Sequence, residues 1–249
     1  MQQLSEPLTL PNLELVPASD TDRVEELLST TDAILMATDD VDSCINESII
    51  NYILDNEKCN QLKRVVTMSR NLNGSGMGMF VSASKAAANA QVWDNSNKAA
   101  YQIYENNVKS AAEKCNADWT IVRAGTLKGG SVGDTTNDES PTYSQYLAEA
   151  YYEVSKTDII TWQLLFDCNV RGVKLNKGDS LPGPGAKAVF TATGSEEHDG
   201  DTGRCGLAEA MVRSLELDEA ANVDFGVATV ASREIPSEEE WTKLFQDCL

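Results

Sequence analysis

Four short apolar segments of strand length constrain the fold of this 249-residue chain more than any other feature. They lie at residues 32–38, 64–69, 118–123 and 223–230. Continuous apolar runs of this length are typical of parallel strands, which are buried on both faces of their sheet. Segments with the apolar spacing of helices separate them, at residues 99–114, 205–217 and 238–248. The alternation predicts the α/β class, with a doubly wound parallel sheet.

Weaker patterns extend this prediction toward the N-terminus. Residues 13–16 alternate apolar and polar side chains, which favours a short strand, and residues 23–28 follow small polar residues that cap helices. Helical spacing also predicts which side chains of two helices face the core. Those side chains are Ile45, Ile49, Ile50, Ile53 and Leu54 in one helix, and Leu207, Met211, Val212 and Leu215 in the other.

The length of the chain suits one large domain. Residues 126–203 contain glycine-rich, acidic and proline-containing stretches that favour loops. We therefore predict a single domain over residues 1–249 with a loop-rich insert at about 126–203.

Charge excludes several classes of partner. The chain has 39 acidic and 20 basic residues, a formal net charge of −19. Such a field repels nucleic acid and anionic membrane surfaces, and it favours docking on basic protein surfaces. No run of 18 apolar residues occurs, so we expect no membrane span.

The residues that bind metals are few and scattered. Cysteines occur at positions 44, 59, 115, 168, 205 and 248, without a C-x-x-C pair, and we expect them to be buried, reduced thiols. The only histidine, His198, lies in a polar stretch that is typical of an exposed loop. We therefore predict no metal site.

One motif points to a family. The segment DWTIVRAGTLKGG at residues 118–130 resembles the end of the Rossmann sheet in atypical, NmrA-like short-chain dehydrogenases. Residues 33–39 and 64–69 resemble the fourth and fifth strands of that family. Residues 205–213 and 223–227 resemble its late helix and its last strand. The resemblance implies a Rossmann-like fold for most of the chain from about residue 13 onward.

The family's cofactor-binding unit has no counterpart in this numbering. Family members open with a strand, a G-x-x-G-x-x-G turn and a helix that together hold the pyrophosphate of NAD(P). Here the sequence starts near the family's third strand, so we expect an N-terminally truncated Rossmann-like domain without a bound cofactor. Gly74, Gly76 and Gly78 follow a strand, and Asp94 comes 20 residues after Gly74, but this context favours a surface loop.

The missing unit would also remove one strand from the sheet. In the family its strand lies beside the strand that residues 32–38 resemble, and its loss would leave a free edge. Three outcomes are open. The strand order closes up, residues 2–16 fill the gap, or a partner covers the edge.

Catalysis in classical members uses a serine, together with a tyrosine four residues before a lysine. This chain offers Ser69, Tyr101, Tyr104 and Lys109. Tyr104 and Lys109 are five residues apart, a separation that does not bring two side chains together on a helix. We expect Tyr104 to pack in the core and Lys109 to be solvated, and we predict no catalytic and no cofactor-binding residues.

Three functions remain open. The first is a non-catalytic scaffold that serves as an accessory or assembly subunit of a large complex with basic surfaces. The resemblance suggests the chloroplast stroma and a thylakoid photosystem, with the cytoplasm as the other compartment. The second is an NADPH-dependent reductase or isomerase, whose cofactor would run past residues 37–39, Ser69 and residues 123–125. The third is an NmrA-type sensor that binds a nucleotide without turnover. We favour the first, because the other two need the glycine-rich unit.

Overall fold

The computed structural model describes residues 13–38, 46–73, 97–128, 172–181, 201–230, 232 and 234–249. Within these ranges, five strands form the main sheet in the order β1-β2-β3-β7-β5. Their bounds are β1 (Ala33–Met36), β2 (Arg64–Arg70), β3 (Asp118–Ala124), β7 (Val223–Val230) and β5 (Gly172–Lys177). The first four run parallel, and β5 pairs antiparallel with β7. The predicted α/β class with a mostly parallel sheet is confirmed.

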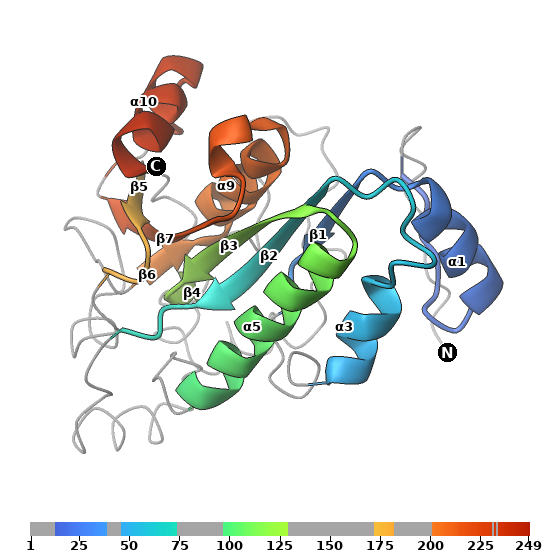
Figure 1. Ribbon diagram of the computed structural model, residues 1–249. Helices are drawn as coiled ribbons and strands as arrows, with labels where there is room; N and C mark the ends of the chain where they lie inside the picture. Colours follow the sequence, from blue (N-terminus) through green and yellow to red (C-terminus); the bar gives the residue numbers. More distant parts are fainter. Residues whose placement is uncertain are drawn as a thin grey trace, which may run out of the picture.

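Helices cover both faces of this sheet (Figure 1). The helices α3 (Glu47–Ile53) and α5 (Lys98–Lys114) pack on one face, and α9 (Arg204–Glu216) and α10 (Glu238–Cys248) pack on the other. A short 3-10 helix, η2 (Asp218–Ala220), leads from α9 into β7. This three-layer arrangement is what a doubly wound sheet requires. No helix in the described ranges is long and apolar enough to cross a membrane.

The central strand β2 shows why the apolar runs form this sheet. All seven of its residues are buried. Val65 belongs to the core under α3 and α5, whereas Val66 and Met68 belong to the core under α9 and α10. Because successive side chains of a strand point to opposite faces, a continuous apolar run supplies both cores at once.

The range 126–203 contributes strands as well as loops. In addition to β5, it contains β4 (Thr126–Lys128) and β6 (Asp201–Gly203), which pair parallel in a second, two-stranded sheet. At Gly172, the first residue of β5, an added Cβ would lie 2.6 Å from the carbonyl oxygen of Val230. The strand pair β5–β7 therefore needs a glycine at this position.

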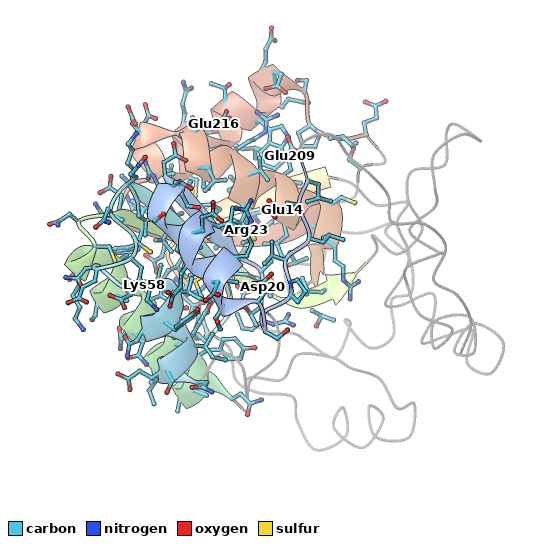
Figure 2. The ribbon with its side chains drawn as sticks, turned by 90° about the vertical axis from the view of Figure 1, so that its right-hand side faces the viewer. Glu14, Asp20, Arg23, Lys58, Glu209 and Glu216 are labelled. Carbon is cyan, nitrogen blue, oxygen red and sulfur yellow. The ribbon has the colours of Figure 1, made fainter. Side chains whose placement is uncertain are left out.

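Helix α1 (Thr21–Thr30) lies beside the β1 edge of the main sheet in both views (Figures 1 and 2). Its Glu25 accepts a hydrogen bond of 2.7 Å from Lys58 in the turn before β2, and its Leu28 is buried in the core under α3 and α5. No strand within the described ranges pairs with the outer edge of β1. Covering an edge with a helix is one way in which proteins block pairing with other chains.

Three expectations from the sequence are wrong. Residues 13–16 form no strand, and Leu13 and Leu15 are exposed there, because no strand of the described ranges lies beside them as a hydrogen-bonding partner. On α3, Ile49 is 42% exposed, while Ile50 and Leu54 are buried as expected. On α9, Val212 is 51% exposed, because it lies next to Met211 on the turn and points away from the sheet. Ile45 lies outside the described residues.

The cysteines also differ from the expectation in one case. Cys59, Cys115 and Cys248 are buried, as expected, but Cys205 is exposed at the start of α9. Burial raises the pKa of all three buried thiols, that of Cys248 to about 11. Cys44 and Cys168 lie outside the described residues.

Two neighbouring residues of α9 test its orientation. Met211 is 2% exposed and Val212 is 51% exposed. Met211→Ala should lower the free energy of unfolding by about 2–5 kcal/mol, because it leaves a cavity in the core. Val212→Ala, the matched control, should change it by less than about 0.5 kcal/mol. Urea unfolding of both variants measures this, and equal losses would contradict the placement of α9.

Thiol labelling tests the two environments of the cysteines. Only the thiolate is a good nucleophile, so a buried thiol with a raised pKa reacts slowly. In the native chain at neutral pH, iodoacetamide should label Cys205 more than about tenfold faster than Cys248. Peptide mass spectrometry over time gives both rates. Equal rates before unfolding would contradict the described burial.

Candidate functional site

A cluster of three buried polar side chains and one half-buried carboxylate, that of Asp224, lies between α5 and the strands β2, β3 and β7. It consists of Ser69 on β2, Glu105 on α5, Arg123 on β3 and Asp224 on β7, and we call it the polar cluster. Ser69 is 0% exposed, and Glu105 and Arg123 are each 5% exposed. Ser69 and Arg123 are also paired in the register of β2 and β3, near the carboxyl ends of both strands. Ligands of open α/β sheets bind outside this end.

The guanidinium of Arg123 organises the polar cluster. Its Nε donates to Oε1 of Glu105 at 2.9 Å, and its Nη2 donates to Oε2 at 2.8 Å, which makes the pair bidentate. Its Nη1 forms an ion pair with the carboxylate of Asp224. The hydroxyl of Ser69 donates to Oε1 of Glu105 at 2.7 Å. The serine hydroxyl is therefore committed to an internal carboxylate.

Burial and ion pairing act in opposite directions on Arg123. Burial alone lowers the pKa of the guanidinium, but the hydrogen bonds and charges of Glu105 and Asp224 outweigh this and raise the pKa above its ordinary value. Arg123 is thus a permanent cation, and it can donate hydrogen bonds but cannot act as an acid or a base. Its arrangement ties α5 to β3 and β7.

The other candidate catalytic residues are placed apart from this cluster. The hydroxyl of Tyr104 lies 2.5 Å from Thr67 Oγ1, and both side chains are buried. Tyr101 is also buried, and its ring meets that of Tyr104 edge to face, with 6.4 Å between centroids. Core packing of Tyr104 is confirmed. Among these four candidates, the structure does not bring a serine, a tyrosine and a lysine together in one accessible site.

Lys109 is only partly solvated. Its Nζ lies 4.4 Å from the centroid of the Trp119 ring, at the start of β3. A cation over an aromatic face is a favourable contact. The ammonium group of Lys109 thus packs against Trp119, where it anchors α5 to the amino end of β3.

Backbone groups that follow β2 and β3 are also bonded within the protein. The amide of Asn71 donates to the carbonyl of Ala124 at 2.9 Å, and Arg70 Nη1 donates to the carbonyl of Gly125 at 2.5 Å. The amide of Gly125 donates to Thr202 Oγ1 at 2.8 Å. Gly125 therefore uses both its amide and its carbonyl internally, at the position where the resemblance places a cofactor.

Other residues of interest fall outside the described residues. These are the glycines at 74, 76 and 78, Asp94, Asp39 and His198. Among the described residues, no group of three or more His, Cys, Asp or Glu side chains could hold a metal ion.

Sequence reasoning missed Glu105, although a signal was present. The residues of α5 that face the sheet are Tyr101, Tyr104, Glu105, Val108, Ala111 and Ala112. A charged residue on such a face needs an oppositely charged partner, because an isolated buried charge is very costly. Arg123, within an apolar strand, is the corresponding signal on the other side.

Comparisons with known proteins give distant structural likenesses only. No family model matches the chain, and no curated protein sequence matches it. Among solved structures, a short-chain dehydrogenase/reductase from Veillonella parvula is 11% identical, with a TM-score of 0.43. That alignment covers 88% of this chain and 73% of the other. The yeast methylglyoxal/isovaleraldehyde reductase, solved with NADPH, is 10% identical over 84% of this chain and 55% of that chain, with a TM-score of 0.41. Sequence identities and TM-scores of this size assign neither a family nor an activity.

The polar cluster makes a prediction about stability. Glu105→Gln removes the carboxylate that Ser69 and Arg123 share and leaves a buried cation poorly compensated. We expect the free energy of unfolding to fall by about 3 kcal/mol or more. Glu113→Gln changes an exposed residue of the same helix and should cost less than about 0.5 kcal/mol. Urea unfolding compares the two variants, and a Glu105→Gln protein as stable as the control would refute the structural role of the pair.

Proposed function

We propose that this chain is a non-catalytic, dehydrogenase-like scaffold that acts as an accessory subunit of a larger protein complex. One observation carries the proposal. Ser69, the residue that the family resemblance offers as the catalytic serine, is 0% exposed and donates its hydroxyl to Glu105. In this state the serine hydroxyl is used within the protein, whereas an acid–base role needs it within hydrogen-bond reach of the substrate.

Further support comes from the residues around the serine. Tyr104 is bonded to Thr67 in the core, and Lys109 packs on Trp119. Neither side chain is placed to exchange a proton with a molecule at the carboxyl end of the sheet. Gly125 is bonded on both its amide and its carbonyl. At Gly125, a dinucleotide would therefore meet backbone groups that are already bonded within the protein, whereas binding sites depend on polar groups that are free to converge on the ligand.

The charge of the chain supports a basic protein as the partner. A formal net charge of −19 favours encounter with basic surfaces and disfavours polyanions. The finer setting that we propose is the stromal face of a thylakoid photosystem. This setting rests on the sequence resemblance alone.

An NADPH-dependent reductase or isomerase is the competing function. It would need the polar cluster to open, so that Ser69 exchanges Glu105 for a substrate. Breaking the buried pair of Glu105 and Arg123 would cost several kcal/mol, which binding would have to supply. Nucleotide binding therefore separates the two functions.

Calorimetric titration of NADPH into the full chain tests the proposal. We expect no saturable heat at micromolar nucleotide, while a dehydrogenase known to bind NADPH gives a binding curve in the same buffer. Saturable binding by this chain would overturn the scaffold role.

Native gel electrophoresis of the endogenous protein is the second experiment. Migration in a stoichiometric assembly supports an accessory subunit, and migration as a monomer contradicts it.

A further inference from the structure

A groove of about 600 Å³ lies between the end of α9 and α10, on the side of the sheet away from the polar cluster. Its floor is apolar and consists of Leu217, Trp241, Phe245 and Leu249. Trp241 and Phe245 are almost fully buried, whereas Leu217 and Leu249 are half-buried. A hollow of this size falls within the range of ligand-binding sites in proteins.

Carboxylates form the charged part of the rim. Glu216 and Glu219 line the groove and are exposed. Figure 2 shows Glu216 at the end of α9, with its side chain outside the packed layers. The remaining exposed lining residues, Thr242 and Gln246 of α10, are uncharged. The rim therefore attracts cations and repels anions.

The only cationic lining residue among those described, Arg213, is already neutralised. Its Nη1 and Nη2 donate to Glu238 on α10 at 2.7 and 2.6 Å, and its Nε donates to Glu209 at 2.9 Å. The guanidinium also lies 5.2 Å from the centroid of the Trp241 ring. Arg213 thus joins α9 to α10, and the charge available to a ligand is that of Glu216 and Glu219.

Trp241 adds an unused donor. Its indole Nε1 is buried and has no hydrogen-bond acceptor among the described residues. Buried indole N–H groups usually find a partner, and leaving one unpaired is unfavourable. An oxygen acceptor on a bound segment, reached by a small shift of the ring, would remove this cost.

We propose that the groove between α9 and α10 binds a short amphipathic helix of a partner protein, apolar on the buried side and flanked by lysine or arginine. This inference rests on the proposed scaffold function and names the surface through which it acts. The apolar floor accepts leucine-like side chains, and the two rim carboxylates pair with the flanking cations.

The dimensions of the groove fit a helix. The part of α10 from Trp241 to Leu249 spans about 12 Å, at a rise of 1.5 Å per residue. A helix of three turns carries anchors at i, i+3 or i+4 and i+7 over a similar length. A second copy of this chain is disfavoured as the occupant, because two surfaces of the same strong negative charge repel each other.

Nuclear magnetic resonance of the full, ¹⁵N-labelled chain detects binding in the groove directly. The chain has four tryptophans, and Trp241→Phe identifies the indole signal of Trp241. The probe is a synthetic 14-residue peptide with leucines at i, i+3, i+4 and i+7 and lysines on its other side. We expect a saturable shift of the Trp241 signal. A scrambled peptide of the same composition should shift it only at more than about tenfold higher concentration.

Paired variants locate the binding site. Thr242→Lys places a cation in the groove and should weaken peptide binding by about tenfold, whereas Gln102→Lys, on the exposed face of α5, should not change it.

A second pair of variants tests the rim charge. Glu216→Gln with Glu219→Gln should weaken peptide binding. Glu57→Gln with Glu113→Gln has the same net charge and should leave peptide binding intact. Equal binding by the variants of either pair, or by the scrambled peptide, would overturn the proposal.

The same samples separate this inference from the scaffold function. Added NADPH should leave all indole signals unchanged. If NADPH shifts them saturably, the scaffold function fails together with the inference. If neither NADPH nor the peptide shifts them, the groove proposal fails alone, and the scaffold role stands on the burial of Ser69.

Discussion

The bidentate pair of Glu105 and Arg123 is the interaction on which the other features of this structure depend. It joins α5 to β3, which follows α5 directly in the sequence, and through Asp224 it reaches the distant strand β7. The pair also withdraws Ser69 from solvent, because the serine hydroxyl needs the same carboxylate. A buried pair of this kind is hard to break from one side, since the remaining charge loses its partner. The stability of the fold and the internal hydrogen bond of Ser69 thus have a single physical cause.

The two faces of the sheet carry different features. The face under α5 contains the polar cluster, whereas the face under α9 and α10 ends in a groove with an apolar floor and an acidic rim. Helix α1 lies along the β1 edge, where an open strand would invite pairing with other chains.

The sequence predicted the layers well and the details of the site poorly. Continuous apolar runs identified β2, β3 and β7, because burial on both faces leaves an unambiguous pattern. The capped helix α10 was found within its observed bounds, since Ser237 and Glu240 form a capping box. Val212 was assigned to the wrong face, because helical spacing tolerates an apolar residue at the border of the buried stripe. Glu105 was missed, since its role depends on Arg123, which comes from another element and is joined to it only by the tertiary fold.

A crystal structure of the full chain grown with NADPH tests the central claim most directly. The account predicts electron density for Ser69 Oγ within hydrogen-bonding distance of Glu105, an intact pair of Glu105 with Arg123, and no nucleotide at the carboxyl ends of β2 and β3. An ordered dinucleotide there, with Ser69 turned away from Glu105 toward the nicotinamide ring, would contradict it.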